Sequence, residues 1–293
     1  ASGSVAIGGT LGSLIPPSVL FILYGIFSEQ SIAKLFIAAI IPGLISLFAY
    51  LVVIYVWVTI RPEDAPIPKE KISHDDRIKA LRDCWAIILL FIVVVGGIYV
   101  GLFTPTEAAG VGAFSTLILG LILTRLNLKR IFSALKESVF QSSMIFVIAI
   151  GGKLFVNFIA LTGLAAEITQ WINTSGVSMF AVMALIVILY IFLGMFLDPI
   201  GIILLTLPLT IPIVESFGFS LIWFGVVVIK LLEIGLVTPP IGLNVFVIKS
   251  IVSDKISLET IFVGVAWFLV AEIFVLAAIL MIPTLSLFLT TFI

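Results

Sequence analysis

The stretch "GLVTPPIGLN", residues 235–244, interrupts a long apolar segment with two adjacent prolines, two glycines, a threonine and an asparagine. Pro239 and Pro240 remove two backbone donors, and each ring clashes with the turn before it, so a continuous helix cannot pass through. Unwound backbone is tolerated at membrane depth only where it is buried in protein or lines a polar cavity. The stretch therefore indicates either such a cavity or a plain kink or loop at the membrane surface.

The composition indicates the environment in which this chain folds. It is 62% hydrophobic and only 11% charged, with a mean hydropathy of +1.36, and apolar runs long enough to cross a bilayer recur along it. These features predict an all-α polytopic membrane protein. The net charge of −1 is uninformative about partners, no basic face suggests a nucleic-acid partner, and the single cysteine, Cys84, excludes an internal disulfide.

The apolar segments divide the chain into parts. The sequence predicts a broken helix at 1–28, a span at 29–60, a polar loop at 61–83, spans plus an interfacial helix at 84–143, a second broken region at 144–256 and a last span at 257–293. Within 144–256 we expect a re-entrant hairpin (177–216) that turns at Asp198-Pro199, and a broken helix (219–252). The interfacial helix is expected at 125–143, where apolar residues at helical spacing alternate with Lys and Arg.

Positively charged residues predict the orientation, because loops rich in Lys and Arg stay cytoplasmic. The predicted spans bring three basic clusters to one side: the 61–83 loop, the segment 125–136 and the segment 249–255. We therefore expect the 61–83 loop to be cytoplasmic and the C-terminus periplasmic, in a multi-pass protein of a bacterial inner membrane.

The opening stretch has a counterpart near the start of the chain. "GSLIPPS" (12–18) and "GLVTPPIG" (235–242) both place Pro-Pro a few residues after Gly, and each precedes a similar entry into a span, "SIAKLF" (31–36) and "SLETIF" (257–262). The predicted orientation makes the two copies cross the membrane in opposite directions. Inverted repeats with paired broken helices are typical of secondary transporters that bind their cargo at the breaks.

Four polar residues inside apolar sequence are candidates for the binding site. Asp198 lies at the predicted hairpin tip, and a charge deep in a bilayer costs about 2.5–3.5 kcal/mol on insertion scales, which favours a function as a cavity acid near the substrate or ion. The alternative is a surface residue at the end of a span. Thr238 and Asn244 have a structural alternative, which is to satisfy the broken backbone. Lys153 is a candidate partner for a carboxylate substrate, or it reaches the interface with its long side chain.

Other polar residues have structural interpretations. Glu107, in "TPTEAA", is expected in the first turn of a helix, where an acid is favourable. Lys230 and Glu233 lie about one helical turn apart before the second break, and they are expected to neutralise each other.

Four ordered motifs resemble one known family. "GSLIPPSVLFILYG", "GLFTPTEAAGVGAF", "MFLDPIGIILLTLPLTIPIVESFG" and "GLVTPPIGLNVFV" are similar to the DctM-like large membrane subunit of TRAP (tripartite ATP-independent periplasmic) transporters. The resemblance covers essentially the whole chain. It implies an elevator-type secondary transporter that couples sodium entry to uptake of a small organic acid, such as a C4-dicarboxylate or a sugar acid. It also implies two partners, a small membrane subunit and a periplasmic substrate-binding protein.

The resemblance also implies positions for two sodium sites. The second would use the Asp198-Pro199 tip with Gly235, Thr238 and Gly242, and the first would use Gly12, Ile15 and Ser18 with a second hairpin. Because Ala1 is not a start methionine, we expect that hairpin to precede it in a longer chain. Asp198, Pro199, Asn244 and Lys153 are the predicted substrate-binding residues, sodium is the coupling ion, and no further cofactor is expected. The segments 1–28 and 144–256 would form the transport domain, and 29–60 and 257–293 would belong to the scaffold.

Two other classes of function remain as alternatives. Broken helices also build ion channels, and a structural membrane subunit of a larger complex needs no binding site. Enzyme chemistry is not expected, because the only histidine, His74, lies in the polar loop and Asp198 is the only aspartate expected within the membrane.

Overall fold

The computed structural model describes residues 2–64, 73–124, 126–252 and 256–292, and these residues form helices and connecting turns with no strand. Six helical segments of the described residues are long and apolar enough to cross a membrane, judged by length and composition, and two of them (Ser2–Phe27 and Ile32–Ile60) each join two helices. The predicted all-α polytopic membrane fold is therefore confirmed. The chain divides into two compact units, one formed by 1–56 with 147–293 and the other by 57–146, and each is described separately.

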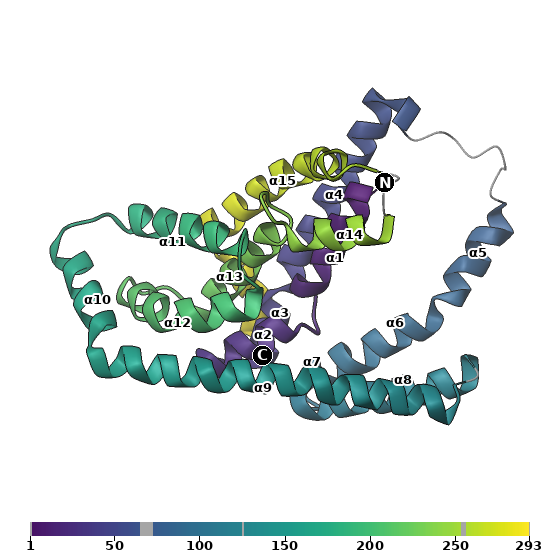
Figure 1. Ribbon diagram of the computed structural model, residues 1–293, viewed down its shortest axis with the longest axis horizontal. Helices are drawn as coiled ribbons and strands as arrows, with labels where there is room; N and C mark the ends of the chain where they lie inside the picture. Colours follow the sequence, from purple (N-terminus) through teal and green to yellow (C-terminus); the bar gives the residue numbers. More distant parts are fainter. Residues whose placement is uncertain (1, 65–72, 125, 253–255, 293) are drawn as a thin grey trace. The chain divides into compact units, whose positions relative to one another are not determined.

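Both predicted helix breaks are present in the first unit (Figure 1). The first separates α1 (Ser2–Leu14) from α2 (Val19–Phe27), and the second separates α13 (Leu221–Gly235) from α14 (Leu243–Val252). The Pro-Pro peptide bond is cis in both breaks. The two stretches that look alike in sequence thus share a helix–break–helix structure.

Helix α13 is the core of the first unit. All but one of its 15 residues are buried, and apart from Lys230 and Glu233 the helix has no charged side chain. It packs against α1, α3 (Ile32–Ala38), α11 (Met179–Gly194) and α15 (Leu258–Met281). The second break therefore begins at the end of a helix that is enclosed by protein.

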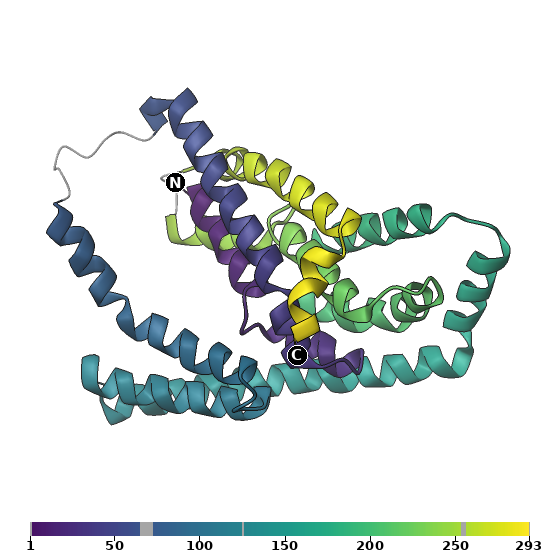
Figure 2. The same cartoon turned by 180° about the vertical axis from the view of Figure 1, so that it is seen from behind.

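Helix α15 lies against α1, α13 and α14 (Figure 2). A Cβ atom on Gly3 would lie 2.6 Å from the carbonyl carbon of Gly264, so the backbones of α1 and α15 nearly touch, as is common where glycines face each other between membrane helices. The remaining helices of this end of the unit are α4 (Ile40–Ile60), α16 (Thr284–Leu287) and a 3-10 turn (Phe288–Phe292).

The predicted hairpin is formed by α11 and α12 (Pro199–Ser216), which pack against each other around the turn at 195–198. Helix α10 (Leu164–Thr174) leads into it from α9 (Leu128–Thr162), as Figure 1 shows. Pro208 and Pro212 lie inside α12. The helix–turn–helix structure is as predicted, and its re-entrant position in a membrane stays a prediction.

Helix α9 differs from the sequence-based prediction. An interfacial helix over 125–143 and a separate span from 144 were expected, whereas the structure has one continuous helix of 35 residues. The change from charged to apolar composition at this point contains neither Gly nor Pro, so nothing in the backbone ends the helix.

The second unit contains a short 3-10 turn (Pro62–Asp64), α5 (His74–Asp83), α6 (Trp85–Phe91), a π-helical turn (Ile92–Gly96), α7 (Gly97–Tyr99), α8 (Pro105–Leu123) and the first part of α9. The side chain of Thr104 accepts a hydrogen bond from the backbone of Glu107, and the Glu107 carboxylate accepts one from the Thr104 backbone. This reciprocal cap confirms the predicted helix start at α8.

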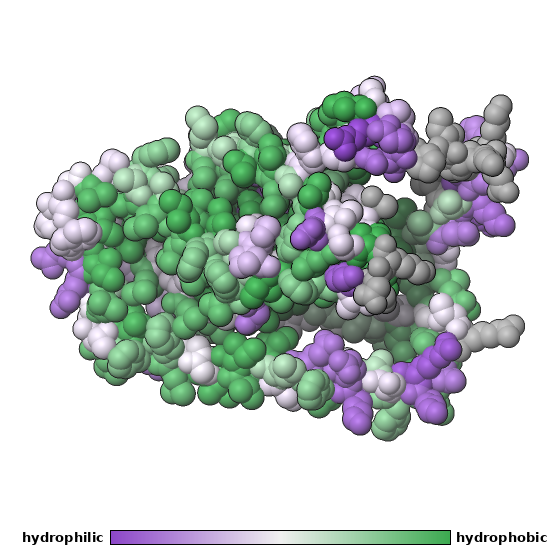
Figure 3. All heavy atoms as spheres, turned by 45° about the horizontal axis from the view of Figure 1, so that its top comes forward, coloured by the Kyte–Doolittle hydropathy of each residue, from purple (hydrophilic) through white to green (hydrophobic). Residues whose placement is uncertain are grey.

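Hydrophobic residues cover most of the surface that Figure 3 shows. Many large apolar side chains of the spans are exposed, among them Phe48, Phe140 and Phe180, at 62–83%. Exposed apolar belts of this kind fit a lipid environment rather than water.

Candidate functional site

The second break is a turn of seven residues between α13 and α14. The Thr238 hydroxyl donates to the Ile234 carbonyl at 2.6 Å, and the backbone N–H of Asn244 donates back across the break to the Leu236 carbonyl at 3.1 Å. Gly242 has a φ of 59°, a left-handed conformation that favours glycine. These features hold the unwound segment in one conformation.

The carbonyl groups of the break are the groups that such a turn offers to a cation. In the described part of the chain, no hydrogen bond reaches the carbonyl oxygens of residues 237–241. Unpaired carbonyls are rare in folded proteins and costly in a membrane, unless water or an ion meets them.

The hairpin meets the second break at a pair of glycines. A Cβ atom on Gly235 would lie 2.6 Å from Cα of Gly194, the last residue of α11. This contact brings the end of α11, four residues before Asp198, against the first residue of the predicted second sodium site. The sequence did not predict the pairing of Gly194 with Gly235.

Asp198 caps helix α12. Its carboxylate accepts a hydrogen bond from the backbone of Gly201 at 2.9 Å, Pro199 occupies the first helical position, and the Asp198 side chain is exposed. Asp followed by Pro is a common helix start. Asp198 thus has a structural role at the hairpin tip, and its binding role remains a prediction.

The first break resembles the second in its hydrogen bonds. The buried Ser18 hydroxyl donates to the Ser13 carbonyl at 2.5 Å, and no hydrogen bond in the described residues reaches the carbonyl oxygens of 15–17. The surroundings differ, because a Cβ atom on Gly12 would meet nothing within 4 Å. Ile15 packs its side chain against Gly43 of α4.

Two predicted substrate-binding residues lie apart. The Asn244 amide lies just after the second break and near the middle of α1, 4.0 Å from the position that a Cβ on Gly9 would take. Lys153 is exposed on α9, and no polar contact in the described residues joins it to either break. The structure brings together Gly235, Thr238, Gly242 and the hairpin end, with Asn244 beside them, and it does not bring Lys153 to this group.

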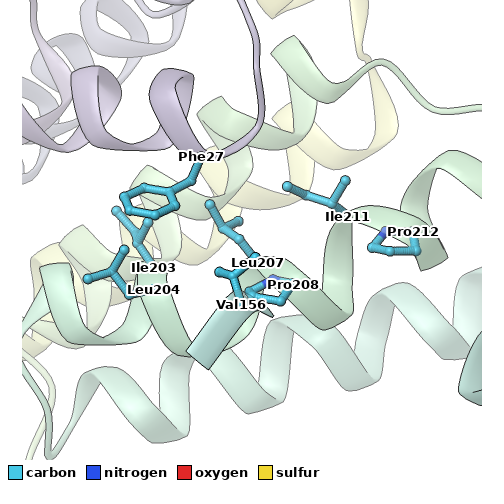
Figure 4. Close-up of a pocket in the computed structure, with 8 residues that line it drawn as sticks. All are labelled: Phe27, Val156, Ile203, Leu204, Leu207, Pro208, Ile211 and Pro212. Atoms are coloured by element: carbon cyan, nitrogen blue, oxygen red, sulfur yellow. The ribbon is translucent and has the colours of Figure 1, made fainter. Parts of the chain in front are cut away.

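A cavity of about 170 Å³ lies elsewhere in the first unit, between α2, α9 and α12 (Figure 4). Its lining is entirely apolar and consists of Phe27, Val156, Ile203, Leu204, Leu207, Pro208, Ile211 and Pro212. A site for a sodium ion or a carboxylate requires polar groups, so this cavity is not the candidate site.

A buried ionic cluster lies in the last turns of α13 and α1, just before the two breaks. Lys230 pairs with Glu233 at 2.9 Å and with Glu272 of α15, and all three side chains are fully buried. Lys230 also donates to Ser46 at 2.7 Å, and Thr10 donates to Glu233 at 2.8 Å. The predicted Lys230–Glu233 pair is confirmed.

Four further residues belong to this cluster and are not among the residues predicted from the sequence: Thr10, Ser46, Tyr50 and Glu272. Tyr50 donates to Glu233 at 3.4 Å. A signal was available only for Glu272, because an isolated acid within the apolar run "FLVAEIFVL" needs a buried partner.

Comparison with known proteins places the chain in a family. The family model described as "Tripartite ATP-independent periplasmic transporter, DctM component" matches residues 1–285.

Individual relatives agree with this match. The chain is 32% identical over 287 residues to a C4-dicarboxylate TRAP transporter large permease protein of Pseudomonas aeruginosa, covering 98% of this chain and 66% of the relative. It is 33% identical over 290 residues to the sialic acid TRAP transporter large permease protein of Vibrio cholerae, covering 99% and 67%. An ectoine/5-hydroxyectoine large permease protein of Ruegeria pomeroyi is 30% identical over 277 residues, covering 94% and 64%.

The chain thus spans about two thirds of the length of these relatives. Over this length the match includes both helix breaks, the hairpin and the buried cluster. The chain therefore belongs to the DctM family, the large membrane component of tripartite ATP-independent periplasmic transporters.

Proposed function

We propose that this chain forms the cargo-binding part of a sodium-coupled symporter for a small organic acid. The observation that carries the proposal is the pair of breaks in which the carbonyl groups of residues 15–17 and 237–241 receive no hydrogen bond from the described residues. Carbonyl and hydroxyl oxygens of this kind are suitable ligands for a hard cation. Gly235, Thr238 and Gly242 would contribute to one sodium site together with the hairpin tip, and Gly12, Ile15 and Ser18 would contribute to the other. The carbonyls of Gly235 and Gly242 also accept backbone hydrogen bonds, from Thr238 and Val245 respectively.

The substrate class follows from the relatives. Their printed substrates are C4-dicarboxylate, sialic acid and ectoine or 5-hydroxyectoine, and each of these compounds carries a carboxylate. We propose a carboxylate-bearing substrate here, bound near Asn244 and the Asp198-Pro199 tip. The helix N-termini of α12 and α14 would favour the negative charge.

The proposed assembly has three components. A small membrane subunit would complete the membrane part, and a periplasmic substrate-binding protein would deliver the substrate. This chain covers only 45% of the length of one relative, a sialic acid TRAP transporter permease protein of Haemophilus influenzae. Transport would proceed by an elevator movement of the breaks and the hairpin against a scaffold.

Loss of one hydroxyl tests the sodium site. Thr238→Val keeps the branched shape and removes the oxygen that lies at the break, so it should raise the sodium concentration for half-maximal uptake about tenfold, the factor for roughly 1.4 kcal/mol of lost binding. Uptake is measured in proteoliposomes with the whole permease, its small subunit and its binding protein. Ser18→Ala should act in the same direction through the first break.

Thr210→Val is the matched control. Thr210 is buried and donates to the Thr206 carbonyl within α12 at 3.0 Å, so the Thr210→Val variant loses a similar hydrogen bond at a place away from both breaks.

Sodium should also raise the melting temperature of the wild-type permease above its value in equal potassium, by mass action. If Thr238→Val and Ser18→Ala keep the wild-type sodium dependence, the breaks are structural and the ion site lies elsewhere.

Asp198→Asn separates the capping role of Asp198 from its charge. Asn caps helices as well as Asp does, so the fold of the hairpin should persist while uptake falls by at least about tenfold, because the charge is removed from the tip. Circular dichroism and melting temperature report the fold, and initial uptake rates report function. Wild-type uptake in Asp198→Asn would leave Asp198 as a helix cap alone.

The orientation is tested by thiol labelling. Cys84 is exposed, so labelling requires a Cys84→Ser background with single cysteines at Ser73 or Thr291. We expect an impermeant reagent to label the 291 site in whole cells with a permeabilised outer membrane, and to label the 73 site only after lysis. The reverse pattern would place the 61–83 loop in the periplasm and contradict the proposed orientation.

A further inference from the structure

The two halves of the first unit meet at the buried cluster. Thr10 of α1 donates to Glu233 of α13, and Lys230 of α13 contacts Ser46 of α4 and Glu272 of α15. All of these side chains are buried, with exposures of 0%. Side chains from four helices, α1, α4, α13 and α15, therefore meet in one polar cluster.

The members of this cluster occupy equivalent positions in the two sequence repeats. Thr10 lies six residues before Pro16, and Glu233 lies six residues before Pro239. In the spans that follow, Ser31 caps α3 and Ser257 caps α15. Ser46 and Glu272 each lie fifteen residues after that cap.

Contacts between equivalent residues are what an internal twofold axis produces, because a residue on such an axis meets its own copy. Thr10 contacts its equivalent Glu233, and a single ammonium group contacts both Ser46 and its equivalent Glu272. The cluster therefore lies at the pseudo-twofold axis that relates the two halves.

The charges are distributed unequally between the halves. Lys230, Glu233 and Glu272 all belong to the second half, and the first half contributes the hydroxyl groups of Thr10, Ser46 and Tyr50. Lys230 corresponds to Ile7, which is buried and apolar. Charge-assisted hydrogen bonds with directed hydroxyl partners hold a narrower geometry than apolar contact at the same place would.

We propose that Thr10, Glu233, Lys230 and Glu272 are positioning residues that fix the two helix breaks relative to each other. Glu233 lies two residues before the end of α13 at Gly235, and Thr10 lies four residues before the end of α1 at Leu14. At 1.5 Å per residue, the cluster is therefore about 3–6 Å along each helix from the break that follows it. A shift of α1 against α13 would move the two breaks by the same amount. The effect on sodium rests on the proposed function, whereas the relative position of the breaks does not.

The position of the breaks is measured with spin labels. In the Cys84→Ser background, labels are attached to cysteines at Val19 and Leu243, the exposed first residues after the two breaks. We expect one narrow distance distribution in the otherwise unchanged whole permease and a broadened or shifted one with Thr10→Val. Thr10→Ser keeps the hydroxyl and should restore the narrow distribution, and Thr210→Val should leave it unchanged.

A second variant guards against misfolding. Glu272→Gln keeps the side-chain volume and removes one of the two carboxylate charges that Lys230 contacts. This variant should broaden the same distance distribution, and it provides the test if Thr10→Val does not fold. Unchanged distributions in the folded variants would overturn the positioning role and leave the cluster with a role in stability alone.

Uptake separates this inference from the proposed function. Thr10→Val should raise the sodium concentration for half-maximal uptake about fivefold with little change in the maximal rate, a factor at the low end for two coupled sites. Broadened distances with no sodium effect on any protein, wild type included, would support the positioning role and contradict the sodium site. A changed sodium dependence with an unchanged distance distribution would contradict the positioning role.

Discussion

Lys230→Met should destabilise the folded protein by about 3–5 kcal/mol, the usual cost of removing one partner from a buried ionic group. Lys230 is the only cation among the described residues that contacts Glu233 and Glu272, and all three side chains are fully buried. Methionine fills a similar volume, so the expected loss comes from two carboxylates left without their counter-charge. The measurement is the free energy of unfolding in detergent micelles, or the shift in melting temperature.

Two variants test this explanation. Lys136→Met makes the same change at an exposed position of α9 and should alter stability by less than about 0.5 kcal/mol. Adding Glu233→Gln and Glu272→Gln to Lys230→Met removes all three charges and should recover part of the loss, because neutral side chains cost less to bury. A Lys230→Met protein as stable as Lys136→Met would show that the cluster is not held by its charges.

Gly235→Ala should lower sodium-dependent uptake by at least about tenfold, because a displacement of about 1 Å at a functional group is enough to lose such a factor. The new Cβ would lie 2.6 Å from Cα of Gly194. Backbone cannot turn aside as a flexible side chain can, so either the hairpin end or the break must move. The measurement is the initial uptake rate at saturating sodium and at low sodium.

Gly8→Ala is the matched control for this prediction. Gly8 lies within α1, where a Cβ would meet nothing within 4 Å, so alanine should leave uptake unchanged and slightly favour the helix. Wild-type uptake in Gly235→Ala would mean that the contact between the hairpin and the second break is not required for transport.

The sequence was sufficient to predict features that depend on local chemistry. Pro-Pro after Gly marks both breaks, Asp198-Pro199 marks the hairpin turn, and Thr104 with Glu107 marks the start of α8. The Lys230–Glu233 pair was also predictable, because residues three apart lie on the same face of a helix. In each of these cases the residues that determine the structure are neighbours in the chain.

Contacts between the halves could not be predicted in this way. Thr10 and Glu233 are separated by 223 residues, and Gly194 meets Gly235 only because α11 packs along α13. Such pairs depend on the rotation and offset of whole helices, which hydrophobic periodicity does not specify when helices are apolar on every side. The continuous helix α9 differs from its prediction for another reason, because a change from charged to apolar composition does not end a helix where neither Gly nor Pro is present.

The buried cluster has a consequence for the synthesis of this protein. Lys230 and Glu233 lie one turn apart on α13, so they can enter the bilayer as a neutral pair while the rest of the chain is still being translated. Glu272 follows on α15 with no charged neighbour within its helix after Glu259, and a lone acid at mid-span costs a few kcal/mol during insertion. The apolar residues of α15 must offset that cost until the two helices meet, and the attraction between Glu272 and Lys230 then favours their association. The packing of α15 against α13 would thus come late in assembly, and it would give Glu272 its counter-charge from a Lys230–Glu233 pair that is already in the membrane.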